Sequence, residues 1–476
     1  MLSVLRNGTY RRLFTAQVVA LVGTGLATVA LGLLAHDIAG GDASAVLGTA
    51  LAIKMAAYVA LSPVIAAAAD RVPRRALLVT ADLVRAGVAL ILPFVDRVGQ
   101  VYLLIFLLQA ASAAFTPAFQ AVVPEVLPDE RDYTRALSMS RLACDLESLC
   151  SPALAAALLT LVSHRWLFLG TAVGFAASAA LVVSAALPRP APPARGGRAR
   201  AQAVSGARLF WATPRLRALL ALDLSVAAAG ALVLVGTVGL VRDHFGRSAG
   251  AVSLALGAYG AGSVVAALCL PRLLGRFSDR AVMLPAALAL PVVLAGVAAV
   301  TATAPGAGPG PWSWYAVLAA WAAIGAACSA VLTPVGRVVR RSAADADLPA
   351  AFAARFSLSH GCWLLTYPLA GWLAAGAGIP VTALALGAIA LASATAAAVI
   401  WPARDPAHLE HAHPDLPRGH PHLTDAHAAS YGGRHGHHYV IDRHHPRWPD
   451  SLTRRRGCGW RSARCRRRRG CRGRCG

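Results

Sequence analysis

The chain has 476 residues, of which 57% are hydrophobic and only 14% are charged. Ordinary soluble domains carry about 25% charged residues, so this composition excludes a soluble globular protein. The formal net charge of +23 suggests a nucleic-acid partner, but its placement argues otherwise. Eleven arginines lie between Arg454 and Arg474, and most others fall in short loops between apolar segments. We therefore expect a membrane protein without a nucleic-acid partner.

Twelve apolar segments follow one another along the chain. A helix that crosses the hydrocarbon core needs about 20 apolar residues. The basic start followed by an apolar run is also typical of a signal peptide, but this run is long enough to span and further spans follow, so we expect an uncleaved first helix. We predict an all-α polytopic membrane protein with spans at 14–35, 45–69, 76–95, 101–123, 137–162, 166–187, 216–241, 250–274, 281–302, 312–336, 354–378 and 380–401.

The arginines of the loops are divided unevenly between the two sides of the predicted membrane. With the N-terminus inside, the cytoplasmic loops hold clusters such as Arg71, Arg74 and Arg75, and the run from Arg189 to Arg217. The outer loops hold only Arg97, Arg165, Arg242 and Arg247. Cytoplasmic loops of membrane proteins carry an excess of lysine and arginine. We expect a multi-pass protein of the cytoplasmic (inner) membrane, in contact with the lipid bilayer, with both termini in the cytoplasm.

A loop rich in proline and arginine, residues 189–215, divides the predicted spans into two sets of six. We expect an N-terminal six-helix bundle (1–188), this loop as a cytoplasmic linker, and a C-terminal six-helix bundle (216–402). A histidine-rich cytoplasmic tail (403–449) and an arginine- and cysteine-rich disordered end (450–476) follow.

The two bundles carry matching sequence landmarks. Asp70 aligns with Asp279, and the segment TPAFQAVVPEVLPDE from Thr116 aligns with TPVGRVVRRSAADAD from Thr333. Each of the longer segments precedes a helix that has a proline at a matching place. Two parallel repeats of six spans predict a carrier that works by alternating access, with its pathway between the bundles.

The segment ADRVPRR, from Ala69 to Arg75, lies between the second and third predicted spans and resembles the loop motif of the major facilitator superfamily. Its residue types suit a charge latch. Asp70 can accept hydrogen bonds from a helix N-terminus or an arginine, while Arg71, Arg74 and Arg75 can pair with acids of the facing bundle. Such pairs hold one conformation closed and break in the other. The alternative is that these arginines only set the topology.

Longer stretches resemble a narrower group within that superfamily. They are RRLFTAQVVALVGTGLATVALGLLA, LPDERDYTRALSMSRLACDLESLCSP, and the tail up to HHYVIDRHHPRWP. Together they are similar to the nickel-resistance (nickel efflux) exporters of the NreB type, which have a histidine-rich C-terminus. The resemblance implies the major facilitator fold and efflux of Ni²⁺, with Co²⁺ a second candidate, by proton antiport. It implies no cofactor besides the transported ion and no enzyme activity, and a monomer is the simplest expectation.

Ionisable side chains inside a span are costly and are functional candidates by default. The fifth span holds Arg141, Asp145 and Glu147. Arg141 and Asp145 can pair on one helix face, whereas Glu147 lies about 200° around the helix from Asp145. We expect Glu147 or Asp145 to exchange protons or attract the cation, with Arg141 tuning its partner; a structural ion pair is the alternative. Asp223 is a second carboxylate candidate. His360 is a candidate proton relay or transient ligand, or else a structural histidine.

Other charged residues in or near the spans are expected to be structural. Lys54 is the only lysine, and it is more simply paired with an acid or extended outward than placed in a cation path. Asp82 and Arg85, three residues apart on the third span, are expected to pair as part of the scaffold. His36 and Asp37, at the outer end of the first span, are either an exit site or an ordinary interfacial end.

The tail contains eleven of the fifteen histidines. Imidazole binds nickel, copper, zinc and cobalt, and a histidine-rich segment does not by itself choose among them. Close spacing lets neighbouring rings share an ion, while prolines and glycines are expected to keep the segment from packing. We expect labile, pH-sensitive metal binding, typical of an entry antenna or a sensor; a polar tail without a metal role is the alternative. The candidate ligands are His408, His411, His413, His420, His422, His427, His435, His437, His438, His444 and His445.

The last segment, residues 450–476, has cysteines without paired CxxC spacing. We interpret it as a membrane-surface patch, a soft-metal site or the product of a shifted reading frame.

The sequence as a whole favours a proton-driven exporter of divalent transition-metal ions that confers metal resistance. Efflux of an organic solute, drug or siderophore-type chelate is the alternative among transporters, and a non-transporting membrane metal sensor is the alternative of another class.

Overall fold

The structure is a computed structural model. It describes residues 2–69, 73–127, 157–187, 206–302, 312–344, 347–403, 408–412 and 434–441, with isolated positions between 129 and 155 and at 445 and 448. The helices of the first half are η1 (Leu2–Arg6), α1 (Gly8–Ala39), η2 (Gly40–Asp42), α2 (Ala43–Ala69), α3 (Arg74–Ile91), η3 (Leu92–Phe94), α4 (Val98–Val126), η4 (His164–Trp166) and α6 (Leu167–Ser184). Those of the second half are α8 (Pro214–Gly239), the π-helical turn η5 (Leu240–His244), α9 (Ala249–Arg276), α10 (Asp279–Thr301), α11 (Ser313–Leu332), α12 (Val335–Arg340) and α13 (Leu348–Ile400).

The predicted twelve-helix, all-α membrane architecture is confirmed. Among the described residues, eight helical stretches are long and apolar enough to cross a membrane, and two of them, 8–60 and 350–400, each cover two predicted spans. Part of α4 is a further apolar helix. Only isolated positions of the fifth predicted span, 137–162, are described.

Local sequence signals set the ends of the helices. The side chain of Asn7 caps α1 by accepting hydrogen bonds from two backbone N–H groups, and Ser278 caps α10 in the same way. Pro214 begins α8 at a position where its missing N–H costs nothing. Gly40 ends α1 with a φ of 53°, and Gly378, with a φ of 80°, breaks α13 into the last two spans. Positive φ favours glycine because it lacks a Cβ.

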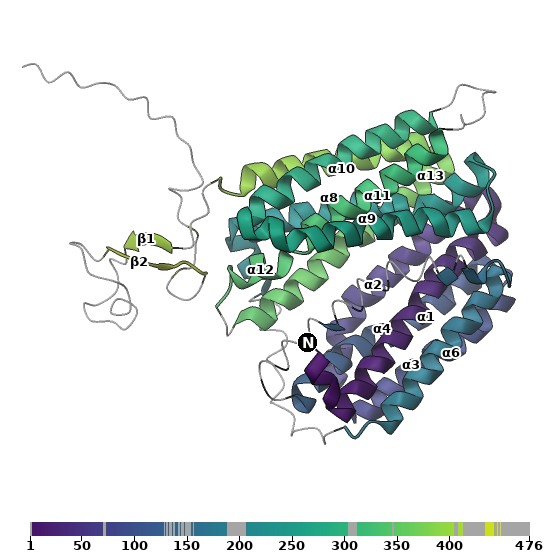
Figure 1. The fold of residues 1–476 in the computed structure, drawn as a ribbon, viewed down its shortest axis with the longest axis horizontal. Helices are drawn as coiled ribbons and strands as arrows, with labels where there is room; N and C mark the ends of the chain where they lie inside the picture. Colours follow the sequence, from purple (N-terminus) through teal and green to yellow (C-terminus); the bar gives the residue numbers. More distant parts are fainter. Residues whose placement is uncertain are drawn as a thin grey trace, which may run out of the picture.

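The helices form two bundles that approach each other at one end (Figure 1). We call the end that carries Gly8 the N-terminal end and the end that carries Ala39 the far end. At the N-terminal end, Asn7 donates to the carbonyl of Val126, and Arg12 donates to that of Ser184. In Figure 1 the two bundles diverge toward the N-terminal end and lie close together at the far end.

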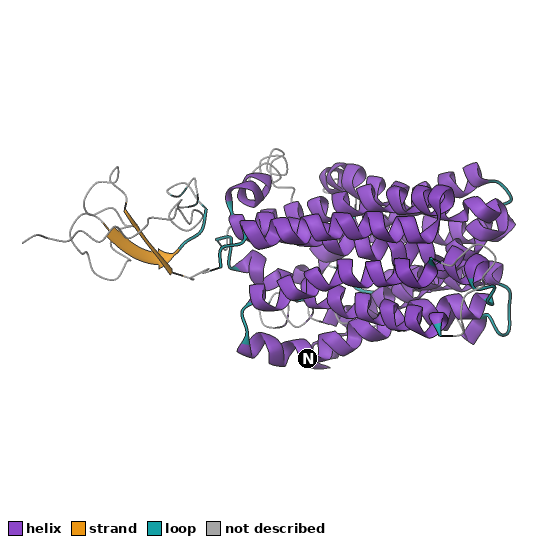
Figure 2. Cartoon of the chain, turned by 90° about the horizontal axis from the view of Figure 1, so that it is seen from above, coloured by secondary structure: helices purple, strands orange, loops and turns teal. Residues whose placement is uncertain are grey.

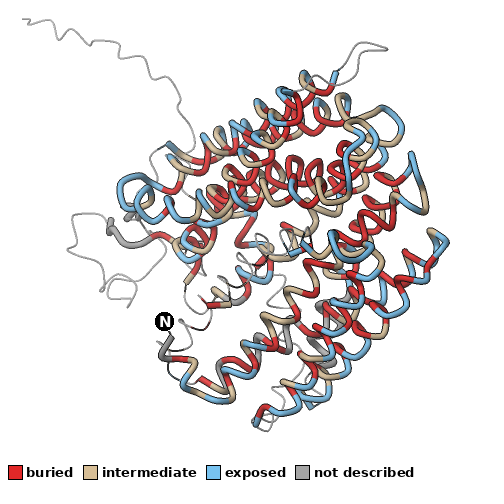
Figure 3. Tube along the Cα trace, turned by 45° about the vertical axis from the view of Figure 1, so that its right-hand side comes forward, coloured by how far each residue is buried: buried red, intermediate tan, exposed pale blue. Residues whose placement is uncertain are grey.

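The outer surface of the two bundles is apolar, as expected for contact with lipid. Large hydrophobic side chains such as Phe94, Val292 and Val399 are 76%, 71% and 81% exposed. Buried residues lie on the inner faces of the helices (Figure 3). Apolar surface of this extent marks a membrane contact rather than a water-facing surface. Helix α8 differs, because most of its residues are buried in the centre of the second bundle.

A glycine-to-glycine contact joins the two bundles near the far end. Gly48 of α2 lies against Gly371 of α13, and a Cβ on Gly48 would lie 2.6 Å from the carbonyl oxygen of Tyr367 and 3.0 Å from Cα of Gly371. Small residues let membrane helices approach this closely. The halves are therefore in backbone contact here.

The tail is not without structure, contrary to our expectation. Strands β1 (His408–Ala412) and β2 (Arg434–His438) pair antiparallel, with His408 opposite His438 and His411 opposite His435. Figure 2 shows these strands outside the helical body. Tyr439, Ile441 and Trp448 pack against the second bundle, because this short stretch carries enough apolar and aromatic surface to bury.

Candidate functional site

A buried carboxylate and an arginine pair inside the second bundle. Asp223, on α8, is 3% exposed. Its Oδ1 accepts a hydrogen bond from Nη2 of Arg355, on α13, at 3.2 Å. Among the described residues, Oδ2 of Asp223 has no hydrogen-bond partner. A carboxylate with one satisfied and one open oxygen can take up a proton or a cation at the open one.

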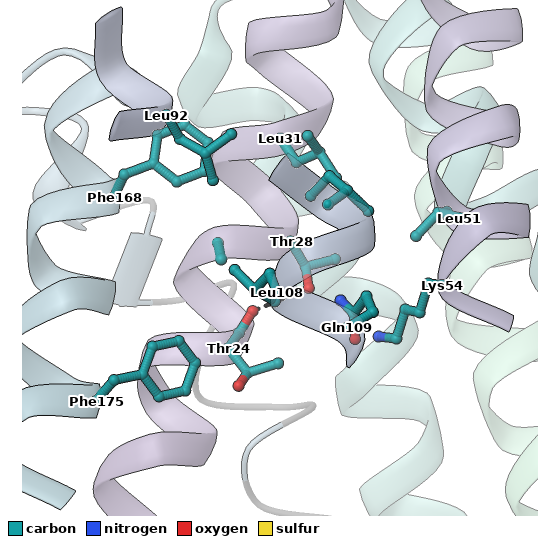
Figure 4. Close-up of a pocket in the computed structure, with 12 residues that line it drawn as sticks. Thr24, Thr28, Leu31, Leu51, Lys54, Leu92, Leu108, Gln109, Phe168 and Phe175 are labelled. Carbon is teal, nitrogen blue, oxygen red and sulfur yellow. Dashed lines mark hydrogen bonds between the residues drawn. The ribbon is translucent and has the colours of Figure 1, made fainter. Parts of the chain in front are cut away.

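A second acid and base interact by charge in the first bundle. Glu147, from the fifth predicted span, is helical and half-buried, and its charge interacts with that of Lys54 on α2. This matches the expectation that Lys54 is paired with an acid. Lys54 also lines a small, partly open pocket of about 30 Å³. Thr24, Thr28 and Gln109 line it too, and the side chains of Lys54 and Gln109 point toward one another in Figure 4.

His360 lies between the two bundles. Its ring stands 5.5 Å from that of Tyr58 on α2, and 4.0 Å from that of Phe356 on its own helix. Nδ1 is 2.7 Å from the carbonyl oxygen of Phe356. Because a carbonyl oxygen only accepts, Nδ1 carries the proton in this hydrogen bond, and Nε2 of the neutral ring keeps its lone pair. That nitrogen can accept a proton or bind a metal ion.

These groups form one charge chain across the protein. The charges of Lys54 and Arg355 both act on His360. Glu147 in turn interacts by charge with Lys54, and Asp223 pairs with Arg355 at 3.2 Å. Each acid is therefore coupled to one base, and both bases are coupled to the histidine. We call Glu147, Lys54, His360, Arg355 and Asp223 the charge chain.

Of the five members of the charge chain, three were predicted from the sequence as functional candidates and two were not. Lys54 was expected to be structural. Arg355 was not singled out because it lies at the beginning of a predicted span, where an arginine is usually explained by the excess of positive charge on the cytoplasmic side. The rule that an ionisable residue within a span is a functional candidate would have selected it. Arg141 and Asp145, predicted beside Glu147, lie outside the described residues.

The predicted loop latch is visible in part. Asp70 and Arg71 lie outside the described residues. Arg75 donates to the carbonyl of Ala185 in its own bundle, and Arg74 also has an interaction partner. Pairing of these arginines with acids of the facing bundle stays a prediction for the other conformation.

In the second bundle, the aspartate that aligns with Asp70 is paired with arginines. Asp279 is 1% exposed and pairs with Arg337 at 2.9 Å and with Arg341 at 3.1 Å. Arg280 donates to the carbonyls of Ala398 and Trp401. The aspartate at the start of α10 thus ties α10 to the segment that follows α11, within one bundle.

The predicted scaffold pair on the third span is confirmed. Arg85 pairs with Asp82, which also accepts a hydrogen bond from Ser178 at 2.7 Å. The guanidinium of Arg85 lies between the rings of Phe115 and Phe175, at 4.3 and 4.4 Å from their centres. With partners on all these sides, the pair fixes α3 against α4 and α6 rather than offering a site.

At the far end, His36 and Asp37 have partners on other elements. Nε2 of His36 is 3.6 Å from Oδ1 of Asp243, which lies in η5 of the second bundle. Asp37 is 3.1 Å from Nε2 of His164. Asp243 and His36 thus link the two bundles where they are in contact, and an exit site at His36 and Asp37 stays a prediction.

The described tail histidines lie mostly on the strands. His408 and His411 belong to β1, and His435, His437 and His438 belong to β2. His445 is 2% exposed. His413, His420, His422, His427 and His444 lie outside the described residues. In the part of the chain that the structure describes, no three His, Cys, Asp or Glu residues come together as a metal-ligand set.

Comparison with known proteins identifies the family. The sequence pattern described as Major Facilitator Superfamily matches residues 13–242 and 224–424, and so covers both bundles. The chain is a member of the Major Facilitator Superfamily. No curated protein matches its sequence.

Solved transporters share the superfamily fold with this chain. A mutant of the nucleoside transporter NupG superposes with a TM-score of 0.65 at 14% identity, over 82% of this chain and all of that one. A POT family transporter in complex with a thioalcohol-conjugated peptide gives 0.64 at 13% identity, over 81% and 94% of the two chains. A bacterial homolog of the human lysosomal transporter Spinster, inward-facing and unoccupied, gives 0.59 at 13% identity, over 83% and 95%.

Membership in this superfamily makes the chain an integral membrane transporter and not an enzyme. Its two bundles are in contact at the far end and diverge toward the N-terminal end. This is the arrangement expected of an alternating-access carrier that is open on the side bearing its N-terminus.

Proposed function

We propose that this superfamily member exports a divalent transition-metal cation, Ni²⁺ first and Co²⁺ second, in exchange for protons. The observation that carries the proposal is the charge chain, which spans both bundles and has His360 at its centre. The histidine-rich tail supports a metal as cargo, since imidazole is a preferred ligand of nickel and cobalt. The strong arginine bias supports the cytoplasmic membrane as location, with both termini inside.

Proton coupling follows from the electrostatics of the charge chain. Two basic side chains, Lys54 and Arg355, interact by charge with His360, and each opposes a positive charge on its ring. A proton and a metal ion compete for the same lone pair on Nε2 of His360, so they exclude each other at that atom. Antiport requires this competition, because the carrier must exchange one cation for the other rather than bind both.

The two carboxylates supply the compensating charge. Asp223 keeps an oxygen without a hydrogen-bond partner among the described residues, so a cation can approach it without first breaking its bond to Arg355. In the other bundle, Glu147 interacts by charge with Lys54. When the bundles rock, the distances from His360 to the two pairs change, and its affinity for cations changes with them.

A second candidate is efflux of an organic anion or an anionic metal chelate. Lys54 and Arg355 favour it, because two cationic side chains flanking one position suit a carboxylate or phosphate group. Under this reading the tail would act on metal outside the transport step.

Everted membrane vesicles distinguish these functions. With the vesicle interior made acid, the full chain is expected to drive Ni²⁺ uptake that collapses when an uncoupler removes the gradient. Glu147→Gln and Asp223→Asn should abolish this uptake when it is expressed per amount of protein in the membrane, while Asp42→Asn, at the far end and outside the charge chain, should not. Absence of gradient-dependent Ni²⁺ uptake by the full chain would contradict metal export. Gradient-dependent uptake only of nickel bound to an anionic chelator would favour the second candidate.

A further inference from the structure

The tail residues Tyr439, Ile441 and Trp448 lie against the base of the second bundle. Tyr439 is 5% exposed and Ile441 is 7% exposed, and both belong to the same hydrophobic core as the helices. Trp448 packs against that core. Each of these side chains loses free rotation when it is buried. Favourable contacts with the bundle must therefore offset that entropy cost.

Arg215 holds the segment at two places. It lies in the first turn of α8 and is 2% exposed. Its Nη2 donates to the backbone carbonyl of Tyr439 at 3.4 Å, and its guanidinium lies 5.0 Å from the ring centre of Trp448. A cation over an indole ring is stabilised by the negative face of the ring, more strongly when both are withdrawn from water. Arg215 therefore belongs to a docking surface for the tail.

His445 is enclosed by this arrangement. Its ring meets that of Tyr439 edge-on, with centres 4.6 Å apart, and Trp448 meets the same tyrosine with centres 5.2 Å apart. At 2% exposure, the imidazole cannot receive a hydrated metal ion while the segment is docked. Metal ligation needs at least one ring nitrogen with open access on the side where the ion and its other ligands lie.

We propose that the tail residues held against Arg215 and the second bundle, namely Tyr439, Ile441, His445 and Trp448, form a metal-responsive arm, which leaves Arg215 when His445 binds a divalent transition-metal ion. Docking and ligation through His445 exclude each other, so each lowers the affinity of the other by the same factor. At low metal concentration the arm rests on α8. As metal loads the tail, His445 is drawn out to complete a ligand set with neighbouring tail histidines, and the arm is released. This rests on the proposed metal-binding role of the tail.

Hydrogen exchange of the full chain in lipid nanodiscs tests the proposal. Peptides covering 439–448 are followed by mass spectrometry without metal and with Ni²⁺, and bound nickel is measured in the same samples by equilibrium dialysis. Without metal the segment should be protected. With Ni²⁺ its exchange should rise by about 5-fold to 150-fold, the usual range for coupled sites.

Three variants separate the contributions. Arg215→Ala should expose the segment with or without metal, whereas the matched change Arg217→Ala, two residues further along α8, should leave it protected without metal. His445→Phe keeps an aromatic ring against Tyr439 but cannot bind metal, so its segment should stay protected in Ni²⁺.

The hydrogen-exchange results show whether the arm is released from Arg215 when nickel binds. Protection unchanged by Ni²⁺ in the native chain, although nickel is bound, overturns the proposal. Release in His445→Phe equal to that of the native chain overturns His445 as the trigger, and a segment unprotected from the start overturns the docking. If no nickel is bound, the metal role of the tail fails instead, and dialysis shows which of the two has failed.

Discussion

The contact between Gly48 and Gly371 holds the two bundles together at the far end, so adding a single methyl group there should change the conformation. In Gly48→Ala the new Cβ would lie 2.6 Å from the Tyr367 carbonyl oxygen, whereas ordinary contact begins near 3.4 Å. The backbones of α2 and α13 must separate by about 0.8 Å to accept it. Neither atom belongs to a flexible side chain that could turn aside.

The cost falls on the conformation that makes this contact. Overpacking of this kind costs about 1–3 kcal/mol. Since about 1.4 kcal/mol is a factor of ten in a population, the balance should move by roughly 5-fold to 150-fold toward conformers that separate the halves at the far end. The matched control is Gly361→Ala on α13, where an added Cβ would meet nothing within 4 Å.

Spin labels introduced as unnatural amino acids at positions 42 and 247, one on each bundle at the far end, report the separation by pulsed electron resonance. The native chain and Gly361→Ala should share a short-distance population, and Gly48→Ala should lose most of it to longer distances. A distance distribution in Gly48→Ala that matches the control would refute the reasoning, because it would mean that the contact does not govern closure.

Two further predictions concern ion pairs. Asp223→Asn leaves the charge of Arg355 without its partner and should cost about 3–5 kcal/mol of stability, toward the lower value because Arg355 is 23% exposed. Adding Arg355→Gln should recover part of this loss, measured as the midpoint temperature of thermal unfolding. A double variant less stable than the single one would contradict this prediction. Asp243→Asn should weaken far-end closure by less than about 1 kcal/mol, because Asp243 is 53% exposed. The same spin-label distances measure it, with Asp96→Asn, at an exposed position just before α4, as control; an equal shift in Asp96→Asn would exclude the pair as its cause.

The fold could be predicted from the sequence to a large extent, because the bilayer imposes a minimum helix length that any span must meet. The break at Gly378 falls between the two last predicted spans, and the pairing of Asp82 with Arg85 follows from their spacing on one helix. Such features depend on residues near each other in the chain, or on a helix length that is set by the thickness of the bilayer.

The site could be predicted only in part, because its partners are far apart in the sequence. Asp223 meets Arg355 across 132 residues, and nothing in the local pattern of either helix selects that partner. His360 acquires its place between two cations only when α2 and α13 pack together. The docking of Tyr439 on Arg215 was missed for the same reason, and because a tail rich in proline and glycine suggests disorder by composition alone.

The π-helical turn at the end of α8 has a consequence for insertions and deletions. A π turn holds one residue more than an α turn, and it occurs where a helix has accommodated an extra residue. Asp243 lies within this turn and reaches His36 from there. Deleting one residue just before it would turn Asp243 by about 100° around the helix axis while leaving every side chain of the link unchanged. The register of the seventh span, and not only the chemistry of its last residues, therefore decides whether the Asp243–His36 link between the bundles can form.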